Sequence, residues 1–504
     1  MSDVIDRRVM LGGETRPRGI VAGGRSKLEW AGMLATGAPA LVVMFTGPLT
    51  WQRMALVALI IIVAVGLWTP FVWVFRGRSI AALVAEEVRF QVRRRQGLFV
   101  PAHHGETVEG KEPSAFVTPA PVGNAGAKSV TLPSGDELAV VHHTNQVPGH
   151  GYTVAFEMVG STSGLETEWG FGAAHEAWGS FCARLARQGS HIRTVQEVMR
   201  VVPYDTADHT KWIGDRIPAA ADPRLGQSYV ELLDYIGGHT EQHRSWLVLR
   251  IPATTMFSAD ALRLGPGEEG RLRLLTEEVV DAMDRARDHG LALRPLDRRR
   301  LGAVLRSLQD AEHPIDQIAG RSFENSWLPW DSHSRRFVTV KAPSGDWLAR
   351  TVRVPKYGIE AGMFAPDFLH PLLSDVSPSV VRTISTVINL TPAAQARGKA
   401  RSDVTLDTGT AAAARGRVSD GSEDDQLTIS QRRLRDLKAG SGHHGAGWGM
   451  TITMFARTQE ELDAACRRIE AAAEKAKITE LEYVDGQQEG GLVASLPLAR
   501  GLKG

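Results

Sequence analysis

The sequence predicts an α+β membrane protein, in which an N-terminal two-helix transmembrane hairpin precedes ferredoxin-like, split βαβ cytoplasmic modules. Two observations predict this class. The chain carries no charge between Arg53 and Arg76, and almost none between Lys27 and Arg53. From residue 150 onwards, strand-like alternation and helix-like periodicity follow each other in the order β-α-β-β-α-β, which is that of the split βαβ motif.

The predicted hairpin covers residues 28–75, after a cytoplasmic segment at 1–27. Its second apolar segment, 54–75, is uncharged and long enough to cross a bilayer, which takes about 20 residues. The first segment is weaker because it contains Pro39 and several glycines. A signal peptide would have a single, shorter apolar core, so two apolar segments in series favour a hairpin.

Residues that would anchor this hairpin flank its two segments. Tryptophan rings favour the membrane interface, and basic residues favour the cytoplasmic side. The basic helix predicted at 76–97 follows the second segment, so both termini are expected in the cytoplasm and the protein is expected as a multi-pass plasma-membrane protein. The predicted anchoring residues are Trp30, Trp51, Trp68, Trp73, Arg76, Arg78, Arg93, Arg94 and Arg95.

The remaining 98–504 region divides by composition. A linker rich in Pro, Gly, Ala and His, which then runs into weak strand patterns, is expected at 98–147, and a first α/β module is expected at 148–320. Its strands are predicted at 151–160, 190–203, 245–253 and 291–297. Its helices are predicted at 169–189, 228–236, 268–290 and 298–310.

A second, looser module is expected at 321–390 and 448–484. It would contain a hairpin at 335–355, strands at 379–390, 448–456 and 478–484, and a helix at 458–476 that opens with a Thr458–Glu461 capping box. Residues 391–447, rich in Ala, Arg, Ser, Gly and Asp, are predicted to form a flexible inserted arm that is partly helical at best. Residues 485–504 form a C-terminal tail.

Composition and motifs argue against several functions. The balance of 58 basic and 57 acidic residues disfavours a general nucleic-acid binder, and no sequence-specific contact with nucleic acid is expected. Two cysteines imply neither a disulfide framework nor a zinc cluster. The stretch GNAGAKS at 123–129 lacks both glycines of a phosphate loop in register. We therefore assign no catalytic, metal or cofactor-binding residue and expect no enzyme activity.

One aromatic pair is a candidate interface. Trp327 and Trp330 occur in SWLPWD, and an exposed pair of tryptophans would mark a contact surface. The alternative is a loop anchored in the core. The sequence alone leaves both interpretations open.

Three stretches carry a resemblance to a known family. GYTVAFEMVG with the following helix, WGMTITMFARTQEELDAACRRIEAAAEKA, and DGQQEGGLVASLPLARG resemble the non-catalytic N-terminal half of the VirB-type conjugation ATPase. The apolar hairpin resembles the third VirB subunit, or PrgI-like module. Together they are similar to a membrane protein of the type IV secretion apparatus in actinobacterial integrative and conjugative elements.

This resemblance implies a non-enzymatic scaffold of a conjugation channel. It implies homo-oligomers, contact with membrane lipid, and docking of a separately encoded VirB-type ATPase and other channel subunits. One alternative is an EccE-like subunit of a type VII secretion membrane complex, which also combines two N-terminal spans with a cytoplasmic α/β domain. A second alternative is a membrane-tethered enzyme of unknown chemistry.

Overall fold

The computed structural model describes most of the chain from residue 118 and parts of the region before it. The described ranges are 9–11, 36, 38–40, 42–46, 48, 50–72, 74–75, 78–79, 84, 87–88, 90–92, 118–119, 121–144, 149–159, 168–203, 213, 216, 222–313, 315–316, 320–360, 362–365, 367–376, 379–414, 422–438 and 441–500. Two compact units result. One contains Met1–Gly13 with Leu98–Gly504, and the other contains Glu14–Gly97.

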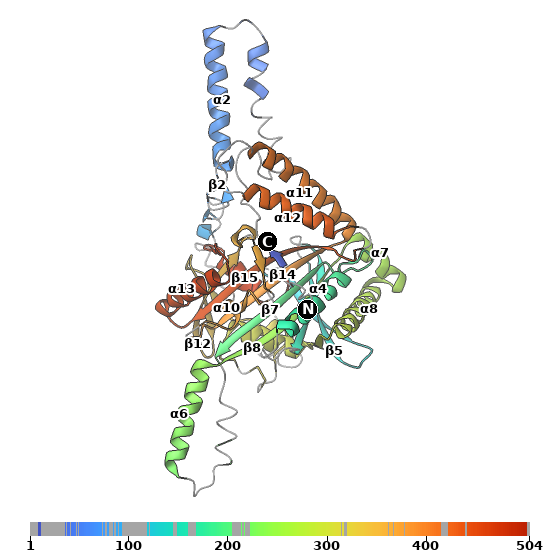
Figure 1. The fold of residues 1–504 in the computed structure, drawn as a ribbon, viewed down its shortest axis with the longest axis vertical. Coiled ribbons are helices and arrows are strands. Elements are labelled where there is room, and N and C mark those ends of the chain that lie inside the picture. Colours follow the sequence, from blue (N-terminus) through green and yellow to red (C-terminus); the bar gives the residue numbers. More distant parts are fainter. Residues whose placement is uncertain are drawn as a thin grey trace, which may run out of the picture. The chain divides into compact units, whose positions relative to one another are not determined.

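Twelve strands of the larger unit form one antiparallel sheet (Figure 1). They are β4 (Ala125–Thr131), β5 (Glu137–His143), β6 (Gly151–Val159), β7 (Thr194–Pro203), β8 (Glu241–Pro252), β9 (Ala292–Pro295), β10 (Trp330–Asp331), β11 (Val338–Ala342), β12 (Gly345–Val354), β14 (Arg382–Thr391), β15 (Gly445–Ala456) and β16 (Glu482–Tyr483). The order is β10-β11-β12-β15-β14-β7-β8-β6-β5-β4, with β16 beside β12 and β9 beside β6. β4 and β5 lie in the range predicted as a linker.

The helices of this unit connect or follow the strands. They are α4 (Glu168–Leu185), α6 (Pro223–His239), α7 (Thr255–Leu264), α8 (Gly267–Asp288), α9 (Arg298–Gln309), α10 (His370–Leu373), α11 (Ala393–Ala414), α12 (Ser422–Asp436), α13 (Gln459–Lys475) and α14 (Gln488–Ala494). A separate two-stranded ribbon pairs β1 (Val9–Leu11) with β13 (Gly362–Phe364).

The two halves of the sheet repeat one connectivity. In the first half, β6, α4, β7, β8, α8 and β9 give the strand order β9-β6-β8-β7. In the second, β12, α10, β14, β15, α13 and β16 give β16-β12-β15-β14. The halves meet where β7 pairs with β14, from Val201 opposite Arg382 to Thr194 opposite Asn389. We call this β7–β14 junction the seam.

The seam corrects part of the predicted fold class, because the expected separate modules are in fact one large antiparallel sheet. A strand at the edge of a small module would present unpaired N–H and C=O groups. Pairing β7 with β14 satisfies these groups in both halves at once. Periodicity within each strand predicts its faces but carries no information on which distant strand will lie beside it.

Alternating side chains give the sheet a core on each face. On one face, Trp246 and Val248 of β8 pack towards α9 and α14. On the other, Leu247 and Leu249 pack towards α4, α7 and α8, and the second half buries its own cluster beneath α13. Successive residues of a strand point to opposite faces, so a strand covered on both sides is apolar throughout.

Local signals explain where the long helices begin and end. α13 starts with the predicted capping box, which is confirmed: Thr458 Oγ1 accepts from the N–H of Glu461, whose carboxylate accepts from the N–H of Thr458. α8 carries Glu268 in its first turn and Arg287 in its last, as the helix dipole favours. These two helices therefore begin or end at residues that match their sequence signals.

Each half carries an insertion between its two central strands. α6 lies between β7 and β8, and the pair α11 and α12 lies between β14 and β15. Because β7 and β14 are antiparallel, these insertions leave the sheet at opposite ends (Figure 1). The segment predicted as a flexible arm thus contains two helices that pack together, with Ala396, Ala400 and Leu437 buried among them.

The smaller unit contains the apolar helix α2 (Trp51–Val72). In the part of the chain that the structure describes, no helix combines the length and the apolar character needed to cross a membrane. The predicted transmembrane hairpin at 28–75 is therefore wrong.

Candidate functional site: the seam of the sheet and an adjoining pocket

A buried ion pair joins the two halves across the seam. Arg382 is the first residue of β14, and Glu241 is the first residue of β8, with β7 between them. The Arg382 side chain is completely buried. Its Nη1 donates to Glu241 Oε1 at 2.7 Å, and its Nη2 donates to Oε2 at 2.8 Å. This parallel, bidentate arrangement is the strongest geometry for an arginine and a carboxylate.

The rest of the guanidinium is also satisfied. Nε donates to Leu372 O at 3.0 Å, Nη1 to Val380 O at 2.9 Å, and Nη2 to Leu373 O at 2.7 Å. A guanidinium has five N–H donors, and all five have acceptors here. Arg382 therefore ties β14 to the segment that precedes it as well as to β8.

Glu241 is held in its charged form. Burial alone would raise the pKa of this carboxyl, but hydrogen bonds from His243, Arg382 and Ser379 and the charge of Arg382 lower the pKa to about 2. Ser379 Oγ donates to Oε1 at 2.7 Å. The pair lies where the chain leaves β7 and returns into β8, so it fixes the base of α6.

The C-terminal segment, residues 485–500, packs on the face of the sheet next to the seam. Gln196 of β7 is fully buried, and its Nε2 lies 3.1 Å from Ala494 O and 3.0 Å from Leu496 O. Its Oε1 accepts from the N–H of Ala499 at 2.7 Å. One side chain therefore contacts three backbone groups of the C-terminal segment.

A directed chain of hydrogen bonds holds the end of this segment. Arg500 Nε donates to His143 Nδ1 at 2.9 Å, which requires His143 to carry its proton on Nε2. That nitrogen lies 3.2 Å from Thr153 Oγ1, which donates to Leu498 O at 3.3 Å. Burial, followed by the charges of Arg500 and Arg250, lowers the pKa of His143 to about 2.

His143 predicts a pH-dependent stability. Its folded-state pKa lies far below the unfolded value near 6.5, so the unfolded chain gains a proton first as pH falls. Stability from this group is complete above about pH 6.5, and we expect a loss of about 2 kcal/mol between pH 7 and pH 5. Urea unfolding at several pH values measures it.

A matched pair of variants isolates this effect. His143→Gln should flatten the pH dependence of the unfolding free energy by that amount, whereas the exposed control His443→Gln should leave it unchanged. An equal slope in wild type and His143→Gln would contradict the assignment.

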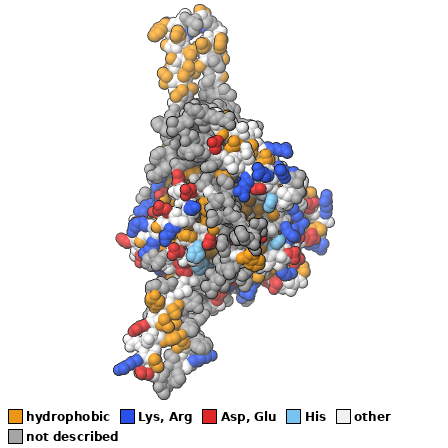
Figure 2. All heavy atoms as spheres, viewed as in Figure 1, with side chains coloured by type: hydrophobic (Ala, Val, Ile, Leu, Met, Phe, Trp, Pro, Cys, Tyr) orange, Lys and Arg blue, Asp and Glu red, His pale blue; other side chains and the backbone are white. Residues whose placement is uncertain are grey.

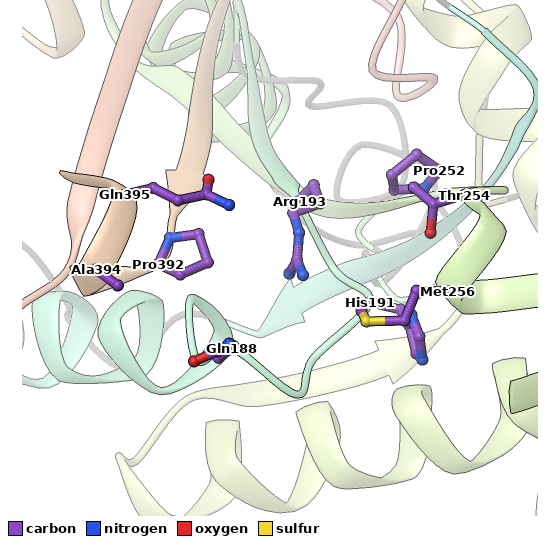
Figure 3. Close-up of a pocket in the computed structure, with 9 residues that line it drawn as sticks. All are labelled: Gln188, His191, Arg193, Pro252, Thr254, Met256, Pro392, Ala394 and Gln395. Atoms are coloured by element: carbon purple, nitrogen blue, oxygen red, sulfur yellow. The ribbon is translucent and has the colours of Figure 1, made fainter. Parts of the chain in front are cut away.

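A pocket of about 320 Å³ opens at the end of the seam (Figure 3). Three segments line it: the loop into β7, the start of α7, and the start of α11. Its lining residues are Gln188, His191, Arg193, Pro252, Thr254, Met256, Pro392, Ala394 and Gln395. In Figure 3 the side chain of Arg193 extends between the residues at the base of α11 and those at the start of α7.

His191, one of the lining residues, is held by several contacts. His191 is 4% exposed, packs edge-on against Phe257 with ring centroids 5.5 Å apart, and places Nε2 3.2 Å from Asp260 Oδ2. The buried carboxylate of Glu278 accepts from Ser190 Oγ and from the N–H of His191. The loop that presents Arg193 is therefore pinned to both α7 and α8.

The candidate interface and membrane-anchoring residues predicted from the sequence are not part of the seam or of the pocket lining. Trp327 and Trp330 are 4% and 1% exposed and pack edge-to-face at 6.2 Å, as in a loop anchored in the core. Trp330 Nε1 donates to Gln309 Oε1 at 3.1 Å. Trp51 begins α2 and is 82% exposed.

The other predicted anchoring positions have no described side chain. Trp68 lies in α2 and Arg78 in β3 (Arg78–Ser79), which pairs with β2 (Val74–Phe75). The remaining positions lie outside the described residues: Trp30, Trp73, Arg76, Arg93, Arg94 and Arg95. Their proposed membrane-anchoring role stays a prediction.

Among the described residues, no group of three or more His, Cys, Asp and Glu side chains is placed to hold a metal ion. Cys182 and Cys466 are both free thiols. Burial raises the pKa of Cys182 to about 12, so this thiol stays protonated and is a poor nucleophile near neutral pH.

Comparison with known protein families gives a match over one part of the chain. Residues 239–341 match the family model described as "Putative type VII ESX secretion system translocon, EccE". The matched segment runs from the start of β8 through α7, α8, β9 and α9 to β11. It includes Glu241 of the seam and the buried Trp327 and Trp330. Comparison with curated proteins gives no match.

The match corrects the type IV assignment. The predicted resemblance to a conjugation-channel protein, with a VirB-type ATPase as partner, is wrong, because the family that matches belongs to type VII secretion. The motifs behind the prediction were short. For example, residues 485–500 of DGQQEGGLVASLPLARG form α14 and the buried segment on the sheet, where Gly491 and Leu496 are buried and Gln488 Oε1 accepts from the N–H of Thr351.

Sequence reasoning missed the seam and the pocket. The available signal was a polar residue within or at the start of an apolar strand: Gln196 in TVQEVMRVVP and Arg382 in VVRTISTVINL. A buried polar group needs a hydrogen-bonding partner, so each implied one. Neither partner could be named, since Glu241 and Ala499 lie more than 140 and 300 residues away along the chain.

Proposed function

We propose that the protein is a non-enzymatic subunit of a type VII secretion membrane complex. The match of residues 239–341 to the EccE translocon family carries this proposal. The matched residues form the structural centre of the first half of the sheet, with β8 covered on both faces. A match over this framework supports a shared fold better than a match over a surface loop would.

The same proposal places the protein in a membrane-associated assembly, where it acts by contacts with other subunits. We propose α6 as one of these contacts. It is anchored at its base by Glu241 and Arg382, yet it exposes large apolar side chains, with Leu225 70% and Leu232 49% exposed (Figure 2). These two residues are seven apart and so share one side of the helix. Exposed apolar patches mark interaction sites.

Copurification tests the function. The full-length tagged protein is crosslinked in its own host, extracted in detergent, and its partners are identified by mass spectrometry. We expect other membrane subunits of a type VII secretion complex, in stoichiometric amounts and as a large assembly. Recovery of a VirB-type ATPase, or of the protein alone, would refute the proposal.

Variants on α6 test the surface separately. Leu225→Ser with Leu232→Ser should reduce recovery of partner subunits about tenfold or more, as expected when anchoring apolar contacts of a few kcal/mol are removed. The double variant Gln227→Ser with Ser228→Ala, on the same helix, should behave as wild type. Unchanged recovery with the Leu variants would reject α6 as a contact while leaving the type VII assignment intact.

A further inference from the structure

We propose that the pocket beside the seam binds a carboxylate carried on a small apolar body, either the C-terminal residue of a peptide chain or a short free carboxylic acid. The pocket joins the core to the base of α11, so its occupant would contact both. This proposal is independent of the secretion assignment.

Arg193 supplies the charge for such a ligand. Its Nη1 donates to Ile192 O at 2.9 Å. Burial lowers the pKa of this guanidinium, and the charge of Glu278 offsets part of that effect. The lining contains neither Asp nor Glu. An arginine always carries its charge in a protein, and its planar guanidinium matches a carboxylate in a bidentate manner. The remaining donors of Arg193 are therefore available to an anionic ligand.

Two acids, Glu278 and Asp260, contact His191 in the pocket lining. Glu278 accepts from Ser190 Oγ at 3.2 Å and from the N–H of His191 at 3.3 Å. Asp260 lies 3.2 Å from His191 Nε2 and 3.1 Å from Arg263 Nη1. Asp260 is thus paired with Arg263, whereas Glu278 accepts from two neutral donors and its charge also acts on Arg193.

Further polar groups converge on the same space. Thr254 caps α7 by accepting from the N–H of Phe257 at 3.1 Å, and its hydroxyl proton remains free to donate. α7 begins at this point, and the positive end of its dipole favours an anion nearby. The amides of Gln188 and Gln395 complete the polar part of the lining.

The apolar lining residues and the pocket volume determine which group can accompany the carboxylate. Pro252, Met256, Pro392 and Ala394 form an apolar surface. A volume of about 320 Å³ lies at the small end of ligand pockets, which suits one residue-sized group. One arginine matches the single charge of a carboxylate, whereas a phosphate group of nearly two charges is typically met by more donors.

Peptide binding tests this proposal on the purified full-length protein. A fluorescein-labelled peptide Gly-Gly-Ala-Leu with a free C-terminal carboxylate is titrated by fluorescence polarisation, next to the same peptide as its C-terminal amide. We expect saturable binding of the acid and at least tenfold weaker binding of the amide. Equal binding of the two, or no saturable binding of any probe, would overturn the proposal.

A competition arm distinguishes the two sources of the carboxylate. If 4-methylpentanoate displaces the peptide at concentrations close to its own affinity for the protein, the pocket takes free acids as well. If 4-methylpentanoate displaces the peptide only at concentrations a hundredfold higher, the pocket is specific for the C-terminal residue of a peptide. Saturable binding of 4-methylpentanoate without peptide binding would assign the site to free acids. Each of these results supports the shared carboxylate chemistry.

Two variants address the site and one serves as control. Arg193→Gln should weaken binding of the acid at least tenfold and abolish the difference between acid and amide. Ala394→Phe, at an exposed position of α11, should block the pocket without touching the arginine. Arg287→Gln, on the 76% exposed Arg287 of α8, should bind as wild type. Wild-type affinity in both Arg193→Gln and Ala394→Phe would also refute the assignment.

Discussion

Arg382→Met should lower the free energy of unfolding by about 3–5 kcal/mol, because it leaves the carboxylate of Glu241 buried without its main counterion. Five donors of the guanidinium are lost together, and three backbone carbonyls lose their partners. The lost hydrogen bonds lie at the seam, so both halves of the sheet should be destabilised in a single unfolding transition. Urea unfolding of the full-length protein, followed by tryptophan fluorescence, measures it.

A double variant separates the net contribution of the ion pair to stability from the cost of leaving one charge without its partner. Glu241→Leu with Arg382→Met replaces both charges by apolar groups and should regain much of the lost stability, as buried ion pairs often allow. Lys475→Met removes an exposed ion pair with Asp375 and should change stability by less than about 1 kcal/mol. An Arg382→Met variant as stable as the Lys475→Met control would contradict the role assigned to the seam.

Gln196→Leu should cost about 3 kcal/mol and release the C-terminal segment. Leucine fills a similar volume but leaves the N–H of Ala499 and the carbonyls of Ala494 and Leu496 without this side chain. Each buried polar group left unsatisfied costs about 1–3 kcal/mol. The unfolding free energy measures the total cost.

Limited proteolysis locates the effect of this variant. Arg500 is 6% exposed, so trypsin should cleave after it slowly in the wild type and rapidly in Gln196→Leu. Gln227→Leu, on the exposed surface of α6, is the matched control and should alter neither stability nor cleavage. Slow cleavage after Arg500 together with wild-type stability in Gln196→Leu would show that the segment is held by other contacts.

Apolar periodicity located most elements of the described region. The strand expected at 151–160 is β6 (Gly151–Val159), and the helix expected at 268–290 is α8 (Gly267–Asp288). Periodicity works here because each element buries one or both of its own faces, which is a property of a dozen neighbouring residues. The 125–131 stretch was missed as a strand because AGAKSVT has small residues and no regular alternation.

The candidate site could not be read from the sequence in the same way. Arg193, Thr254 and Gln395 each lie in an unremarkable loop or helix start and only become a pocket when three segments meet. Likewise, Arg382 and Glu241 are recognisable one by one as polar residues at strand ends, but their pairing depends on β7 lying between them.

By itself the sequence determined the type and the approximate limits of the α/β elements, since these follow from local periodicity, capping and turn residues. It did not determine how the elements combine. Only the tertiary structure decided that β7 and β14 join two halves into one sheet, that the C-terminal segment fills a polar face, and that no described helix meets the requirements of a membrane span. The physical reason is that strand edges pair through backbone N–H and C=O groups, which are the same in nearly every residue, so the choice of partner rests on packing and buried polar contacts between distant parts of the chain.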